Sequence, residues 1–117
     1  VHGNGLQTRS FTHIDDVVQG FVLAGERSHS IDGKHSLSGC SFNIGSSEEV
    51  SILELSERIV KITESKIATR VGTEGYFGDS KRRVPECNSA EQLLGWQCST
   101  SLDAGLNQVW QVLISQP

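Results

Sequence analysis

Helix-like and strand-like segments alternate along this chain, and that alternation limits its fold more than any other feature. The clearest helix begins at Ser51, where Ser51 and Glu54 form a capping box. Its apolar residues recur on one helical face: Ile52, Leu55, Ile59 and Ile62. An earlier helix is expected to run from a cap at Asp15 or Asp16 to Gly25. Its apolar face comprises Ile14, Val17, Val18 and Phe21.

Two more helices are expected nearer the C-terminus. Ser89 and Gln92 begin a short one that Gly95 ends, and Ser101 begins the last one. The apolar stripe of that last helix is Leu102, Leu106, Val109 and Leu113. Short strands are expected at 9–14, 40–44 and 67–71, with irregular segments at 26–39 and 72–85. The order β-α-β-α-β-α-α, without an internal repeat, predicts a single α/β domain over residues 1–117.

Composition narrows the possible partners. The net charge of −4 argues against a nucleic-acid-binding surface, and no apolar run approaches the ~18 residues of a membrane span. Cys40, Cys87 and Cys98 are odd in number and show no CxxC spacing, which predicts free thiols in a reducing cytoplasm. Because the chain has no methionine and starts at Val1, we expect it to be a piece of a longer polypeptide.

The stretch GTEGYFG, residues 72–78, has glycines spaced as in loops that hold a dinucleotide pyrophosphate. Such a loop needs a helix after it, whose N-terminus faces the phosphates. The following residues have no apolar stripe, and Pro85 would break a helix there. Tyr76 and Lys81 are also five residues apart, not the four that would place them on one helical face. We therefore expect this chain alone to bind no NAD.

Other candidate chemistry is weak. The histidines lack the spacing of a metal site, and three serines lack the strand-turn-helix context of an esterase nucleophile. The histidines are His2, His13, His29 and His35, and the serines are Ser10, Ser46 and Ser47. No metal site is expected.

Arginine is the remaining candidate. Arg9 and the basic run 81–83 both lie near glycine-rich turns in an acidic chain. The planar guanidinium binds phosphate or carboxylate with two parallel hydrogen bonds. The alternative is a strand-end arginine at position 9 and a solvated basic turn at 81–83. The residues alone leave both interpretations open.

Three blocks of sequence, in order, resemble one family. GNGLQTRSFTHIDDVVQGFVLA, residues 3–24, is similar to the segment G-x-G-x-Q-x-R-x-F-x-x-V-x-D, with Ile14 at the valine position. FNIGSSEEVSILELSERI and GDSKRRVPECNSAEQLLGWQCSTSLDAGL resemble the later strand-loop-helix and the C-terminal tail. The family is the extended short-chain dehydrogenases/reductases, the NAD-dependent nucleotide-sugar epimerases and dehydratases. Within that family, the three blocks most resemble the UDP-glucuronate decarboxylase branch.

The resemblance implies the C-terminal, substrate-binding part of a Rossmann-type enzyme. The N-terminal half with a TGxxGxxG loop for NAD and a Tyr-x-x-x-Lys pair has no counterpart in this sequence. By motif, Gln7 and Arg9 would lie along the nucleotide diphosphate and Phe77 near the nucleotide. Arg83 would lie on the substrate side, with an auxiliary catalytic role. Asp16 would be only a helix cap.

The resemblance also implies partners. These are a nucleotide-sugar substrate and either the missing Rossmann half or a second copy of the chain, with NAD as cofactor of the intact enzyme. The chain would act on a UDP- or dTDP-sugar through a keto intermediate. Two alternatives are a non-catalytic binding or interaction module and an inactive remnant of such an enzyme.

Overall fold

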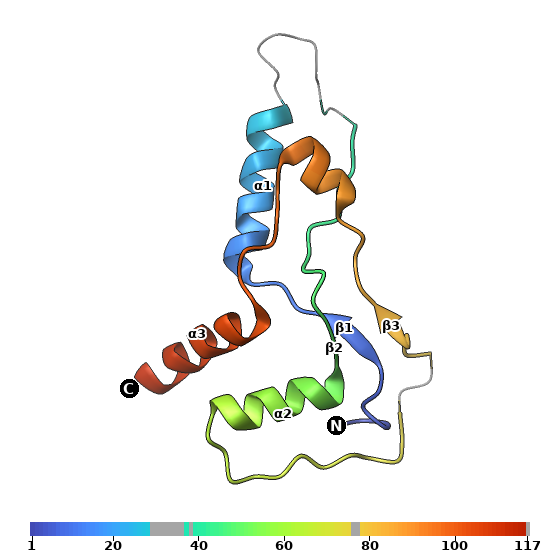
Figure 1. Ribbon diagram of the computed structural model, residues 1–117, viewed down its shortest axis with the longest axis vertical. Coiled ribbons are helices and arrows are strands. Elements are labelled where there is room, and N and C mark those ends of the chain that lie inside the picture. The colour runs from blue at the N-terminus through green and yellow to red at the C-terminus, as the bar shows by residue number, and fades with distance from the viewer. Residues whose placement is uncertain (29–36, 38, 76–77, 117) are drawn as a thin grey trace.

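The computed structural model of the chain describes residues 1–28, 37, 39–75 and 78–116. Its elements follow the order β1, α1, β2, α2, β3, η1 and α3 (Figure 1). The strands are β1 (Thr8–Ser10), β2 (Glu49–Ser51) and β3 (Arg82–Arg83). The helices are α1 (Ile14–Ser28), α2 (Ile52–Ile62), the short π-type helix η1 (Ala90–Leu94) and α3 (Leu102–Ser115). The α/β class and the alternating order of elements are confirmed.

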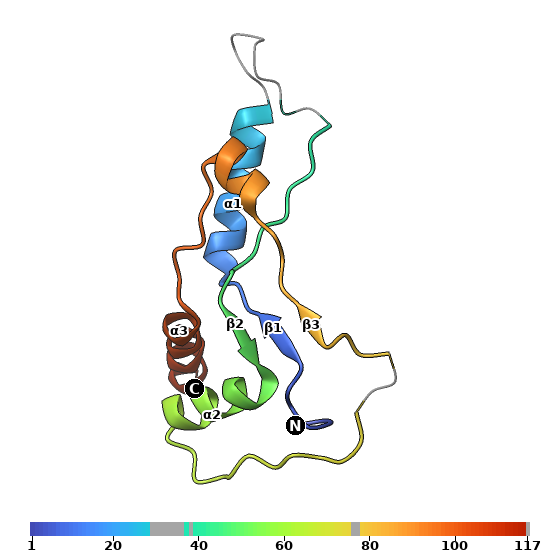
Figure 2. The same cartoon turned by 45° about the vertical axis from the view of Figure 1, so that its right-hand side comes forward.

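β1 is the middle strand of a three-stranded sheet of order β2-β1-β3. β2 pairs antiparallel with β1, placing Val50 opposite Arg9, and β3 pairs parallel with it, placing Arg83 opposite Arg9. Figures 1 and 2 show the three strands side by side, with α2 continuing directly from β2. The sheet thus joins the beginning of the chain to the basic run that follows Gly78.

The strand expected at 40–44 is wrong. This segment is irregular, although Phe42 and Ile44 are half-buried as expected for apolar residues. Both side chains pack against a cluster of helical residues, and such burial requires no pairing with another strand. The strand in this part of the chain is β2, which begins only at Glu49.

The strand expected at 67–71 is also wrong. Ile67 is 78% exposed, so the β-branched run buries little surface that a sheet would cover. The segment is held instead by a 3.1 Å hydrogen bond between the hydroxyls of Thr69 and Ser56 and by backbone bonds of Val1 to the Arg70 carbonyl and from Gly72 N, each 2.8 Å long. β3 lies further along, in a polar stretch where alternation of apolar residues could not locate it.

Helix α1 differs from expectation at both ends. β1 ends at Ser10 and α1 begins at Ile14, inside the run expected to be a strand. The helix also continues through Gly25 to Ser28. A glycine inside a helix costs only about 1 kcal/mol, and the last turn gains a hydrogen bond from Arg27 Nη1 to the carbonyl of Leu93 at 3.2 Å.

The starts of α2 and α3 are confirmed. Ser51 Oγ accepts from Glu54 N, and the Glu54 carboxylate accepts from Ser51 N, which completes the capping box. Ser101 Oγ accepts from Ala104 N at the start of α3. η1 ends at Gly95 as expected, with φ at 63°, a conformation that glycine adopts without strain.

The core is small and lies between α1 and η1. Its fully buried members are Ala90, Leu94 and Trp96. Around them pack Leu23, Ala24, Leu37, Phe42, Ile44, Cys87 and Cys98. Gly20 lets α1 approach Ile44 closely, since a Cβ at this position would stand 3.0 Å from the Ile44 side chain. The three cysteines are free thiols, as the sequence predicts.

Asp16 has a larger role than the helix cap expected of it. Its carboxylate is 2% exposed and accepts hydrogen bonds from Ser99 N and Oγ and from Thr100 N. Its backbone carbonyl accepts from Trp96 Nε1 at 2.8 Å. Burial would raise the pKa of this carboxyl, but the bonds from Ser99 and Thr100 outweigh burial and hold the pKa well below its ordinary range. Asp16 thereby fixes the segment between η1 and α3 against α1.

Large apolar side chains remain uncovered on two helices. On α1 these are Ile14, Val18, Phe21 and Val22, and on α3 they are Val109, Val112, Leu113 and Ile114. The chain is also extended: its radius of gyration is 17.9 Å, against about 13 Å for a compact domain of roughly 100 residues. No helix among the described residues has the length and apolarity to span a bilayer. These apolar side chains are thus exposed to solvent on both helices.

Replacing Asp16 with asparagine should destabilise the fold. The asparagine amide nitrogen is a donor and would face the N–H groups of Ser99 and Thr100, which are donors too. Loss of hydrogen bonds to a charged acceptor should lower the free energy of unfolding by about 1.5–3 kcal/mol. Urea unfolding followed by circular dichroism at pH 7 measures the loss. The control is Asp15→Asn, an exposed neighbour, which should change the free energy of unfolding by less than about 0.5 kcal/mol. Equal stability of the two variants would contradict the role of Asp16.

The same carboxylate predicts an acid dependence. Because its pKa is lowered in the folded chain, the stability that it contributes is complete above the ordinary value of 3.8 and declines as the pH falls below it. Unfolding free energies of the wild type should therefore fall more steeply from pH 5 to pH 3 than those of Asp16→Asn. Parallel curves would contradict this assignment.

The uncovered apolar faces predict self-association. Patches larger than a few hundred Å² are rare on monomeric proteins, because they attract other apolar surfaces. Light scattering should show concentration-dependent growth in mass, and a hydrophobic dye should fluoresce on the native chain. Phe21→Lys, on α1, should reduce both signals, whereas Ile67→Lys changes an exposed apolar residue outside the two helices and serves as the control. A strictly monomeric, dye-silent wild type would contradict the prediction.

Candidate functional site

The candidate site lies on the sheet, where the two arginines expected to bind substrate meet. Arg9 of β1 and Arg83 of β3 are register partners in the parallel pair. Residues opposite each other in a parallel pair lie on the same face of the sheet. The fold therefore joins two arginines that the sequence separates widely.

Arg9 is held by three acceptors. Nη1 donates to the carbonyls of Thr8 at 2.7 Å and Ser80 at 2.8 Å, and Nη2 forms an ion pair with Asp79 Oδ1. Its side chain is only 16% exposed. Arg9 thus fixes the turn that precedes β3, a role beyond the phosphate contact expected of it. A guanidinium has five N–H groups, so some remain for a ligand.

Arg83 is placed differently from Arg9. It is exposed, and its guanidinium has no hydrogen-bond partner within residues 1–28, 37, 39–75 and 78–116. Its charge is therefore available to an anion in solution. The basic run thus contributes at least one cation that the fold itself does not use.

Arg82 points to the opposite face. Its Nε and Nη2 atoms donate to both carboxylate oxygens of Glu49 on β2, at 2.9 to 3.1 Å. Thr8 Oγ1 donates to the same carboxylate at 2.6 Å, so this cluster joins all three strands. The bonds from Arg82 and then Thr8 lower the pKa of Glu49. Arg82 is a structural ion-pair residue in this arrangement.

A groove of about 390 Å³ opens where the residues before β1 meet those before β3. Its lining comprises Gly3, Asn4, Leu6, Gln7, Gly75, Asp79 and Lys81. A 2.8 Å hydrogen bond from Gly3 N to the Glu74 carbonyl joins the two walls. Gln7, which the family resemblance places along the nucleotide, lines this groove, and its amide donates a long 3.4 Å hydrogen bond to the His2 carbonyl.

Phe77, the remaining substrate residue expected from the sequence, lies outside the described residues, as does Tyr76. Two charged residues of the groove were given no substrate role by the sequence. Asp79 and Lys81 stand in the block that resembles the family tail, and Lys81 belongs to the basic run 81–83, but neither has the planar fork that singled out the arginines. Their position relative to Arg9 becomes visible only through the parallel pairing of β1 and β3.

The described part of the chain shows which element follows the 72–78 stretch. The next element after Gly78 is the strand β3, whereas a loop that holds a dinucleotide pyrophosphate is followed directly by a helix. Within the described residues, no group of three potential metal ligands comes together.

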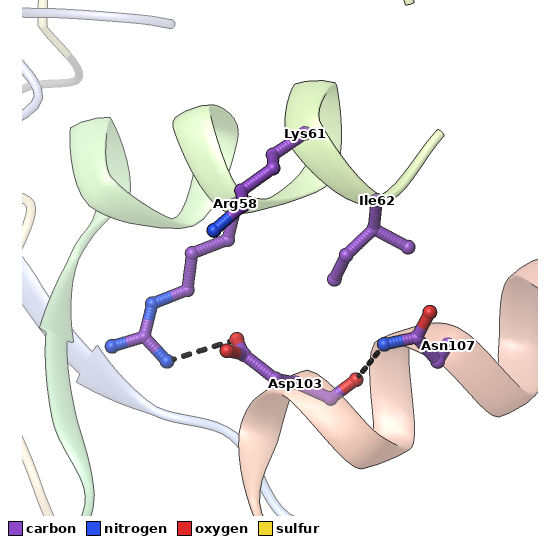
Figure 3. Close-up of a pocket in the computed structure, with 5 residues that line it drawn as sticks. All are labelled: Arg58, Lys61, Ile62, Asp103 and Asn107. Atoms are coloured by element: carbon purple, nitrogen blue, oxygen red, sulfur yellow. Dashed lines mark hydrogen bonds and ion pairs between the residues drawn. The ribbon is translucent and has the colours of Figure 1, made fainter. Parts of the chain in front are cut away.

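A second, larger cleft lies between α2 and α3 and has a volume of about 640 Å³. Figure 3 shows Arg58 of α2 reaching toward Asp103 of α3, and their atoms Nη1 and Oδ1 are 3.2 Å apart. Arg58 Nη1 also donates to Glu48 at 2.7 Å, and Glu48 in turn accepts from Leu102 N. The bonds from Leu102 N and Arg58 lower the pKa of Glu48. In this network the positive charge of Arg58 is paired with the carboxylates of Glu48 and Asp103, and these bonds hold α3 against α2.

Known proteins match this chain along nearly all of its length. The chain matches the GDP-mannose 4,6 dehydratase family over residues 1–109. UDP-glucuronic acid decarboxylase 1 of Danio rerio is 32% identical over 111 residues, which are 95% of this chain and 24% of that protein. The decarboxylase 1 of Arabidopsis thaliana is 34% identical over 106 residues, covering 91% of this chain and 22% of that protein.

A solved structure agrees with the fold. UDP-glucuronic acid 4-epimerase from Bacillus cereus, in complex with UDP-glucuronic acid and NAD, is similar with a TM-score of 0.79 at 30% identity. The similarity covers 97% of this chain and 34% of that one. The chain spans about a quarter of the length of the curated relatives named above. Sequence and structure together show that the chain belongs to the GDP-mannose 4,6-dehydratase family, among the extended short-chain dehydrogenases/reductases that act as NAD-dependent epimerases and dehydratases.

Proposed function

We propose that this chain is the nucleotide-sugar-binding portion of an NAD-dependent epimerase, dehydratase or decarboxylase. The observation that carries the proposal is the sheet face on which Arg9 and Arg83 are register partners, beside the groove lined by Gln7. Arg83 has no partner for its charge among the described residues, so it can attract the negative charge of a phosphate. We propose that Gln7, Arg9, Arg83 and Phe77 contact the nucleotide-sugar, with Arg83 in an auxiliary catalytic role.

The relatives support a proposal for the substrate class. The two decarboxylases and the epimerase carry UDP-glucuronic acid in their names, and the epimerase structure contains it together with NAD. We therefore propose a UDP-sugar, or the closely similar dTDP-sugar, that reacts through a keto intermediate. NAD would be held by a Rossmann half, and this chain would supply position and complementary charge. Free thiols support a reducing cytoplasm as the location.

A second candidate is a non-catalytic nucleotide-sugar-binding or interaction module. The uncovered apolar faces of α1 and α3 favour it as much as they favour an absent Rossmann half. The coding sequence upstream of Val1 separates the two. A TGxxGxxG loop and a Tyr-x-x-x-Lys pair encoded there would support the enzyme, and their absence would support the module.

The chain alone should bind a UDP-sugar without converting it. Calorimetry with UDP-glucuronic acid should give a saturable signal, whereas NAD should give none, because the 72–78 stretch lacks a following helix. Product analysis after long incubation should find unchanged UDP-glucuronic acid. NAD binding that a Gly75→Val change abolishes would contradict the proposal and assign the loop to the cofactor.

Alanine variants of the three arginines should differ in their affinity for UDP in the same titration. Arg83→Ala and Arg9→Ala should each lose about 1.5–3 kcal/mol of UDP binding, the range for hydrogen bonds to charged groups. Lysine at either position should restore only part of it, since the bidentate fork is lost. Arg82→Ala is the matched control and should bind nearly as the wild type, because its side chain contacts Glu49 on the other face. A loss confined to Arg82→Ala would place the site on that other face.

A further inference from the structure

A third cation lies beside the sheet face of Arg9 and Arg83. Side chains alternate between the two faces of a strand, so Arg83 lies on the face opposite Arg82, and Lys81, in the bend just before β3, lines the groove beside the sheet. The contact of Arg82 with Glu49 and Thr8 fits this alternation. Thr8 N donates to the Lys81 carbonyl at 2.8 Å, so Lys81 already belongs to the paired region of β1 and β3.

The charges at this face and its groove do not cancel. Arg9 is matched by Asp79, with which it forms an ion pair. Lys81 and Arg83 are both exposed, and neither has an ion-pair or hydrogen-bond partner for its side-chain charge among the residues that the structure describes. The α2–α3 cleft differs, since Arg58 there is shared between two carboxylates. The sheet face and its groove are therefore more cationic than that cleft.

The backbone that carries Lys81 is fixed on both sides. The Ser80 carbonyl accepts from Arg9 Nη1 at 2.8 Å, and Ser80 Oγ donates to the Arg82 carbonyl at 2.8 Å. These bonds hold the turn in one conformation, so little ordering is left for a ligand to impose. Lys81 lines the groove together with Gln7 and Asn4, whose amides can bond to polar atoms of a ligand.

We propose that Lys81 is a binding residue for the diphosphate of the nucleotide-sugar, presented to the groove by the turn that Arg9 fixes. This inference rests on the proposed function and adds to it a residue that no arginine-based reasoning identified. A lysine ammonium acts as a point charge, which suits a diphosphate whose oxygens spread the negative charge. Arg9 acts on this contact as a positioning residue, in addition to its own spare donors.

The test is calorimetric titration of the whole chain with UDP, UMP and NAD at low and at physiological salt. Lys81→Gln should weaken UDP binding about five- to tenfold at low salt, between the effects of an exposed ion pair and of a charge-assisted hydrogen bond. The weakening should be smaller for UMP, which lacks the second phosphate, and smaller at higher salt, which screens exposed charges. Lys81→Arg should retain binding because it keeps the charge.

The matched control is Lys66→Gln, which removes the same charge from an exposed lysine outside the groove. Thermal unfolding of each variant confirms an unchanged fold. UDP binding that Lys81→Gln leaves intact, or that Lys66→Gln weakens equally, would overturn the role of Lys81 while the proposed function stands. Failure of the wild type to bind UDP would overturn both. NAD binding that depends on Lys81 would assign the cation to a dinucleotide instead and overturn the proposal.

Discussion

The buried carboxylate of Asp16 joins helix α1, near the start of the chain, to the segment that connects η1 with α3. Among the described residues, the core between α1 and η1 has three fully buried members, so apolar packing alone gives limited stability. Asp16 adds charge-assisted bonds to Ser99 and Thr100, and its carbonyl accepts from Trp96, itself a core residue. These bonds set the path from η1 to α3. The orientation of α3, and hence its contact with α2, depends on them.

Arg9 has a similar structural role at the sheet. Asp16 accepts hydrogen bonds from backbone donors, and Arg9 donates to the carbonyls of Thr8 and Ser80 and pairs with the carboxylate of Asp79. Both residues belong to the block at 3–24 that resembles the family. One carries a negative charge and the other a positive charge, and each is matched by groups that lie far along the sequence. The stability of any variant at Asp16 or Arg9 should therefore be measured before a loss of ligand binding is attributed to the substitution.

The sequence predicts the elements that carry their own local signals. The capping box at Ser51 and Glu54 and the glycine at position 95 determine helix ends through neighbouring residues, and both are confirmed. The strands were misplaced because β2 and β3 are short and polar, and their pairing with β1 depends on contacts across the whole chain. Apolar runs at 40–44 and 67–71 suggested strands, but the first packs on helices and the second stays largely exposed.

Prediction of the candidate site from the sequence has the same limit, because part of the site depends on strand pairing. The arginines could be proposed from residue chemistry and from the resemblance, but Asp79 and Lys81 acquire a role only once β1 and β3 are paired. The arginines of the candidate site and the uncovered apolar side chains belong to different elements. Arg9 and Arg83 lie on the sheet, while the large exposed apolar residues lie chiefly on α1 and α3. A protein partner would cover apolar surface, whereas a small anion would require charge and open space. The two surfaces can therefore be occupied together, and the binding of a nucleotide at the sheet need not compete with the contact that covers the helices.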